Sequence, residues 1–185
     1  MTADGRPANG EAAPALPGME DAGLGPVRTF KAPEAMGTRF HEVRAKSVLN
    51  QVPEGPYGFG WTVNPYRGCS HACVYCFARP THTYLGFDAG RDFEKEIVVK
   101  VNAPEVLRAE LARASWEREL VALGTNTDPY QWVESRYRLT RGILEALDEA
   151  ETPVSVLTKS PLVLSDLALF ERMNGRRPVR VNLSI

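Results

Sequence analysis

Cysteine is scarce in this chain, and its three cysteines, Cys69, Cys73 and Cys76, fall within one short stretch. A disulfide would leave one of them unpaired, and no charged-then-apolar signal pattern at the N-terminus suggests export. No apolar run approaches the roughly 20 residues that a membrane-spanning helix needs. Reduced cysteines without an export signal predict a cytoplasmic protein.

The chain also lacks an excess of charge of either sign. Its 22 lysines and arginines nearly balance 23 aspartates and glutamates, for a net charge of −1. This balance provides no global electrostatic reason to expect nucleic-acid binding. The length of 185 residues and the hydrophobic content of 43% are instead typical of one domain with a real core.

Bulky apolar side chains are rare in residues 1–27, which are rich in alanine, glycine and proline. Such a segment buries too little surface to offset the entropy of ordering, so it is predicted to be a disordered leader. We expect residues 28–60 to form an N-terminal lead-in, ending in a loop rich in glycine and proline from Pro53 to Gly60. Residues 61–185 are expected to form the main folded unit.

Short apolar runs alternate with helical patterns through this main unit, which predicts an α/β fold with right-handed βαβ units and a parallel sheet. Asn102 and Ser160 are placed to cap helices, a further helix is expected over residues 135–150, and Gly175 is placed to end the last one. The five expected strands cover residues 61–64, 97–101, 120–123, 154–157 and 179–185.

Polar residues follow several of these strands, at Thr125–Asp128, Thr158–Ser160 and Asn182–Ser184. In parallel α/β sheets and barrels, ligands bind at the carboxyl ends of the strands. These residues are therefore candidates for ligand binding. Asp128 precedes a proline and suits either a turn or the mouth of a substrate site.

The spacing of the cysteines, C-x3-C-x2-C, suits a loop wrapped around a metal centre, because no regular strand places three such sulfurs on one face. Thiolates favour iron–sulfur clusters, zinc or Cu(I). Three thiolates leave one iron of a four-iron cluster open to a small molecule. A zinc site is the alternative, with His71 or His82 completing a Cys3His set, although no second pair of ligands follows downstream.

The stretch Asn64–Phe77, with Tyr75 just before the last cysteine, resembles the cluster motif of the radical S-adenosylmethionine (SAM) superfamily. Within that superfamily it is most similar to the branch of spore photoproduct lyases and DNA repair photolyase-like proteins. The resemblance implies a 4Fe-4S cluster held by Cys69, Cys73 and Cys76, with SAM chelating the fourth iron. It also implies reductive cleavage of SAM to a 5′-deoxyadenosyl radical, driven by an electron donor of the flavodoxin or ferredoxin type.

The resemblance further implies a six-stranded partial (β/α) barrel and a set of SAM contacts. Tyr75 would lie beside the adenine, Lys159 would pair with the SAM carboxylate, and Thr127 and Ser184 would add hydrogen bonds. The sequence stops at the end of the fifth expected strand. We therefore expect either a truncated barrel, which could be inactive, or missing elements supplied by another chain.

The chain departs from the lyase pattern in one respect, because the additional cysteine that returns a hydrogen atom in those enzymes has no counterpart in Gly124–Thr127. The substrate is therefore unassigned, and only the name of the branch suggests nucleic acid as a substrate. A non-catalytic binding module that holds zinc or a cluster is the alternative function. Arg67 and Arg79 flank the loop and could balance thiolate charge or contact a phosphate, although solvated arginine is the default.

Overall fold

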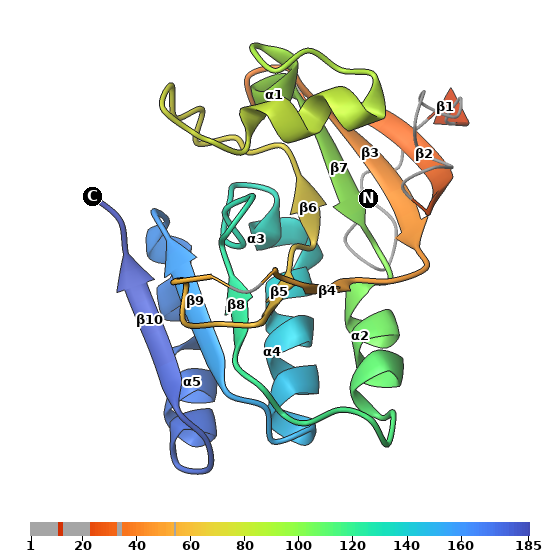
Figure 1. Cartoon of the computed structure of the whole chain (residues 1–185). Coiled ribbons are helices and arrows are strands. Elements are labelled where there is room, and N and C mark those ends of the chain that lie inside the picture. The colour runs from red at the N-terminus through yellow and green to blue at the C-terminus, as the bar shows by residue number, and fades with distance from the viewer. Residues whose placement is uncertain (1–10, 13–22, 33–34, 54) are drawn as a thin grey trace.

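The computed structural model describes residues 11–12, 23–32, 35–53 and 55–185, and in these residues the chain forms a mixed α/β fold with two sheets. Figure 1 shows sheet A in the upper part of the view and sheet B in the lower part. The first sheet, sheet A, has the strand order β1 (Glu11–Ala12), β2 (Leu24–Ala32), β3 (Thr38–Ala45), β7 (Glu96–Lys100) and β6 (Tyr66–Arg67). The second, sheet B, has the order β10 (Val179–Leu183), β9 (Val154–Thr158), β8 (Val121–Leu123), β5 (Trp61–Val63) and β4 (Leu49–Gln51).

Sheet A is built on an antiparallel hairpin of β2 and β3, which the sequence pattern did not predict. Strand β2 begins at Leu24, within the segment expected to be a leader, rather than near Arg28. The rest of the expected leader lies largely outside the described residues, apart from Glu11–Ala12, which pairs with β2. The hairpin forms because the residues at alternate positions of each strand bury one face of the sheet, and Phe30 lies opposite Phe40 on that face.

Sheet B contains the parallel strands that the sequence predicts, with one exception. Strands β5, β8, β9 and β10 run parallel, and β4 is antiparallel at the edge. Residues 97–101 were expected as the second strand of this sheet, but they form β7, which pairs with β3 in sheet A. In the described part of the chain β10 is therefore the fourth parallel strand rather than the fifth, and no closed barrel is present.

The expected boundary near residue 60 does not separate the two sheets. Strands β6 and β7, from the main unit, complete sheet A, whereas β4, from the lead-in, extends sheet B. The two segments therefore fold together.

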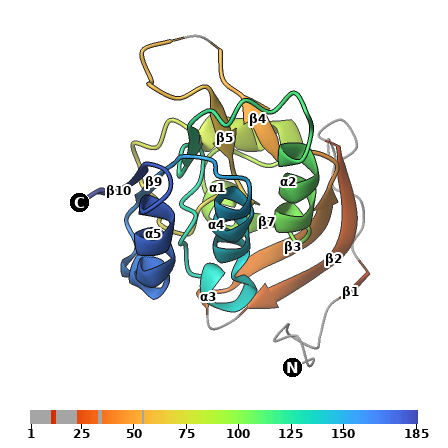
Figure 2. The same ribbon diagram turned by 90° about the horizontal axis from the view of Figure 1, so that it is seen from below.

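Helices α2 (Ala103–Leu111), α4 (Leu139–Glu149) and α5 (Leu167–Asn174) cover one face of sheet B, as Figures 1 and 2 show. Their apolar faces and the strands enclose the main core, which includes Val63, Leu107, Leu123, Ile143, Leu144, Leu147 and Val156. The remaining helices are short: α1 (Asp92–Lys95), α3 (Glu134–Tyr137) and the 3-10 helices η2 (Arg79–Leu85) and η3 (Pro161–Asp166).

The helix ends differ in part from expectation. The helix predicted over residues 135–150 is divided into α3 and α4, because Arg138 adopts a left-handed φ of 52°. Asn102 occupies the N-cap position of α2 as expected, but its side chain makes no capping hydrogen bond; its amide instead pairs with the backbone of Ala45, at 2.8 and 2.9 Å. Ser160 does cap, accepting a hydrogen bond from the Leu162 amide at 3.2 Å, whereas Gly175 ends α5 in a right-handed conformation.

No helix within the described residues is both long enough and apolar enough to cross a membrane.

Candidate metal and cofactor site

The loop that carries the three cysteines is locked at its start by Gly68. Gly68 has a φ of 80°, and a Cβ there would lie 2.8 Å from the carbonyl oxygen of Phe93. The amide of Cys69 donates a hydrogen bond of 2.9 Å to the same oxygen. Only glycine permits this close approach, so the backbone at the first cysteine is held against the segment that leads into β7.

Successive tight turns carry the loop through its three free cysteines. The Ala72 amide bonds the Cys69 carbonyl at 3.3 Å, and the Cys76 amide bonds the Cys73 carbonyl at 3.2 Å. Arg79 crosses the back of the loop, donating from Nε to the Cys73 carbonyl at 2.9 Å and from Nη2 to the Ala72 carbonyl at 3.1 Å. The default expectation of a solvated arginine is therefore wrong for Arg79, which braces the loop.

The three cysteines differ in their surroundings. Cys69 is 9% exposed, and burial raises the pKa of its thiol to about 11, whereas Cys73 and Cys76 are half-buried. A bound metal would reverse this preference, because coordination deprotonates a thiol. Within the described residues, no three histidine, cysteine, aspartate or glutamate side chains are grouped as a single metal ion requires.

The two histidines considered as zinc ligands lie in different places. His82 is fully buried, stacks on Phe87 and contacts the Glu96 carbonyl through Nε2 at 2.9 Å. His71 lies in the cysteine loop, with Nε2 3.1 Å from Oδ2 of Asp128 but outside hydrogen-bond geometry. The packing of His82 is that of a core histidine, and His71 is directed at a carboxylate.

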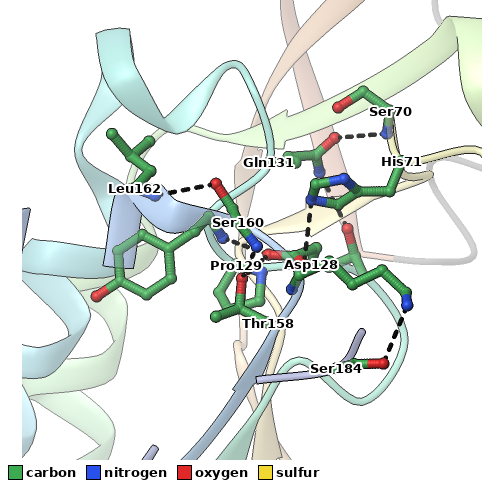
Figure 3. A network of polar contacts seen from close by, with 12 residues as sticks. Ser70, His71, Asp128, Pro129, Gln131, Thr158, Ser160, Leu162 and Ser184 are labelled. Carbon is green, nitrogen blue, oxygen red and sulfur yellow. Dashed lines mark hydrogen bonds and ion pairs between the residues drawn. The ribbon is translucent and has the colours of Figure 1, made fainter. Parts of the chain in front are cut away.

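Residues after β8 hold the cysteine loop from the other side. The hydroxyl of Thr127 donates to the Gly68 carbonyl at 2.7 Å and accepts from Nε2 of Gln131 at 3.0 Å. Gln131 also accepts, through Oε1, from the Ser70 amide at 3.0 Å, a contact drawn in Figure 3. Thr127 is buried, and both of these hydrogen bonds place its hydroxyl beneath the loop.

Asp128 is the centre of a second set of contacts, shown in Figure 3. Its Oδ1 accepts from the Thr158 hydroxyl at 2.6 Å and from the Tyr130 amide at 2.8 Å, and its Oδ2 accepts from the Lys159 amide at 2.7 Å. Burial raises the pKa of Asp128, but its contacts with His71 and these donors outweigh burial and lower it below the usual value. Asp128 thus joins the end of β8 to the end of β9.

Lys159 and Ser184 meet at the ends of neighbouring parallel strands. Leu183 of β10 pairs with Thr158 of β9, so the next residue of each strand reaches the same edge of the sheet. The Lys159 Nζ donates to the Ser184 hydroxyl at 3.0 Å and lies 5.8 Å from the centre of the Tyr75 ring. Interaction with the Tyr75 side chain is the main cause of a raised pKa at Lys159.

Tyr75, Lys159 and Ser184, three of the four residues predicted to contact SAM, are therefore brought together beside the cysteine loop, while Thr127 lies beneath it. Tyr75 is 75% exposed, so its ring is open to solvent.

Gly124 allows the strand ends to converge. It has a φ of 91°, and a Cβ there would lie 1.9 Å from the Leu157 carbonyl oxygen. Two further residues of the site, Asn64 and Gln131, were missed by the sequence analysis; Asn64 accepts from the Asn126 amide at 3.3 Å. A polar residue directly after a buried strand, as Asn64 is after β5, is the signal that could have identified it.

Comparison with known proteins gives relatives but no function. No protein-family model and no solved structure matches the chain. Uncharacterized proteins of Mycobacterium bovis and Mycobacterium tuberculosis are 55% identical to it over 172 residues, covering 92% of this chain and 50% of each relative. An uncharacterized protein of Methanocaldococcus jannaschii is 30% identical over 144 residues, covering 78% of this chain and 50% of the relative.

The chain thus spans about half the length of the curated relatives that it matches. It is a mixed α/β protein in which residues that follow the parallel strands β8 and β9 contact the cysteine loop.

Proposed function

We propose that this chain is the radical SAM portion of an enzyme that cleaves SAM reductively. The observation that carries the proposal is the meeting of a three-cysteine loop with Lys159 and Ser184 at the carboxyl ends of parallel strands. Under this proposal sheet B and its helices are part of a partial (β/α) barrel of the radical SAM type. The motif resemblance and the polar strand ends are independent reasons for it.

The residues of the cysteine loop fit a 4Fe-4S cluster. Cys69, Cys73 and Cys76 are free thiols in one loop, and the Gly68 and Arg79 contacts hold that loop in place. When bound, a 4Fe-4S cluster would bind SAM at its open iron and supply the electron that cleaves the sulfonium to a 5′-deoxyadenosyl radical.

The chain's own residues would orient SAM. The Lys159 ammonium would donate to the SAM carboxylate, and the Ser184 hydroxyl, 3.0 Å from it, would fix the position of that ammonium. Tyr75 would offer its exposed ring to the adenine. Thr127 would hold the cysteine loop in place through the hydrogen bond from its hydroxyl to the Gly68 carbonyl.

A reducing protein of the flavodoxin or ferredoxin type would supply electrons, and we propose a cytoplasmic location because the cysteines must stay reduced. The substrate stays unassigned, and nucleic acid is one candidate class. The complete enzyme would include the parts that the longer relatives add to the matched half.

Titration of SAM into anaerobically reconstituted protein tests the proposal through Lys159. Loss of a charge-assisted hydrogen bond, worth about 1.5–3 kcal/mol, should weaken SAM binding of Lys159→Ala roughly 10- to 100-fold. The cluster should still assemble, because no thiolate changes. The electron paramagnetic resonance signal of the reduced cluster reports both binding and assembly.

Lys46→Ala is the matched control, because Lys46 is an exposed lysine that follows β3 of sheet A, whereas Lys159 follows β9 of sheet B. The Lys46→Ala variant should bind SAM as the unaltered protein does. Equal SAM affinity in both variants would remove Lys159 from the site. Loss of the cluster in Lys159→Ala would show that the lysine supports the loop rather than SAM.

A further inference from the structure

Two cations, Arg67 and Lys100, lie on the same face of sheet A next to the cysteine loop. Strands β6 and β7 are antiparallel, with Arg67 opposite Val98 and Tyr66 opposite Val99. Residues directly opposite share a face, and alternate residues of a strand do too, so Arg67, Val98 and Lys100 share one face. Diagonal neighbours of this kind have Cα atoms roughly 7–8 Å apart.

This face is turned toward the protein interior. Val98 belongs to the main core with Val43, Val63 and Leu85, whereas Tyr66 and Val99 belong to a separate cluster on the opposite face. Lys100 is only 6% exposed, and Arg67 is half-buried. Burial and repulsion by Arg67 lower the pKa of Lys100 to about 8, and the nearby Glu110 opposes this only weakly.

Neither side chain has a hydrogen-bond or ion-pair partner in the described part of the chain. Glu110 is the acidic group that acts on Lys100, but its carboxylate is already occupied. It accepts from the Ser47 hydroxyl at 2.6 Å and from the amides of Val48 and Leu49 at 3.1 and 3.0 Å.

A buried ammonium without a partner is costly, and buried charges in proteins are normally paired. Among the described residues, the polar side-chain atoms that are both sealed from solvent and unpartnered are His71 Nε2 and His82 Nδ1. The Nζ of Lys100 is not one of them, so it keeps access to solvent.

We propose that Arg67 and Lys100 bind a phosphate group, carried by a phosphorylated substrate or present as free phosphate. The guanidinium offers a planar fork for two oxygens, and the ammonium supplies a second positive charge for a dianion. Arg67 directly precedes Gly68, whose carbonyl is held by Thr127. A phosphate bound here would thus lie at the base of the cysteine loop and help to position a substrate.

Phosphate binding to the full chain tests this inference without reference to iron. Thermal unfolding and calorimetric titration are run on cluster-free protein with inorganic phosphate, with adenosine monophosphate, and with sodium chloride at matched ionic strength. Lys100→Met should weaken phosphate binding about 10-fold or more, the loss expected for one charge-assisted hydrogen bond. It should also raise the Tm in phosphate-free buffer, because an uncompensated buried charge is removed.

Lys46→Met removes one exposed lysine and should leave both quantities unchanged. Tighter binding of adenosine monophosphate than of inorganic phosphate would assign the site to a phosphate ester, and the reverse order would assign it to free phosphate. A Lys100→Met chain that responds to phosphate as the unaltered chain does would overturn the inference. Phosphate binding through Lys100 in a chain that takes up no iron would leave this site standing and overturn only the proposed function.

Discussion

Asp128 joins the ends of β8 and β9, and its replacement by asparagine changes the chemistry of that junction with almost no change of shape. The carboxylate accepts three hydrogen bonds, from the Thr158 hydroxyl, the Tyr130 amide and the Lys159 amide. Asparagine keeps one oxygen but turns the other acceptor into a donor. In either orientation of the amide, at least one buried donor faces an NH2 group.

The cost follows from these contacts. A hydrogen bond to a charged group contributes about 1.5–3 kcal/mol, and an unsatisfied buried donor costs about 1–3 kcal/mol. Asp128 is only 9% exposed, so solvent replaces the lost partner poorly. We expect Asp128→Asn to lower the free energy of unfolding by about 2–4 kcal/mol. Because the Lys159 backbone loses its anchor, SAM binding should also weaken about tenfold, or 1.4 kcal/mol.

Urea unfolding and SAM titration of the reconstituted protein measure the two effects separately. Asp166→Asn is the matched control, because Asp166 is also buried and accepts from the Tyr130 hydroxyl at 2.9 Å and from Arg141 at 2.7 Å. It should lose comparable stability while SAM affinity stays unchanged. An Asp128→Asn protein that matches the Asp166→Asn control in both measurements would refute the role assigned to Asp128.

Two further substitutions test other parts of the fold. Burial raises the pKa of Glu134 to about 7 from its usual 4.5, so stability should be lost as pH rises through this window, by about 3 kcal/mol at 1.36 kcal/mol per unit. Urea unfolding at pH 5 and pH 8 should show this loss of stability, and Glu134→Gln should reduce it. The same change in the free energy of unfolding between the two pH values in both proteins would contradict the expectation. Gly124→Ala should cost about 2 kcal/mol or more because of its positive φ and the nearby Leu157 carbonyl. Gly175→Ala, at a φ of −68°, should be neutral or slightly stabilising; equal thermal stability of these two variants would show that the strand ends can separate freely.

The parallel strands of sheet B and their polar ends were predictable because most of them are short apolar runs followed at once by polar residues. Runs such as Val121–Leu123 and Val154–Thr158 carry this signal locally. The convergence of Lys159 and Ser184 then follows from parallel pairing, since parallel strands end at one edge.

The sheet to which β7 belongs was not predictable in this way. Ile97, Val98 and Val99 are all buried, a pattern that suits any strand covered on both faces. Its pairing is decided by β3, where Phe40 lies opposite Ile97, and such long-range partners leave no local trace. The break at Arg138, and the lack of a partner for Lys100 among the residues that the structure describes, are equally products of tertiary packing.

Iron and sulfide analysis after anaerobic reconstitution tests the proposed cluster most directly. The unaltered chain should take up four irons and four sulfides, with a visible absorption that bleaches on reduction, as expected of a 4Fe-4S centre. Alanine at Cys69, Cys73 or Cys76 should abolish that uptake, because two thiolates cannot hold a cluster that already has one open iron. Stoichiometric zinc in a colourless protein, or full iron content in any of the three cysteine variants, would contradict the proposal.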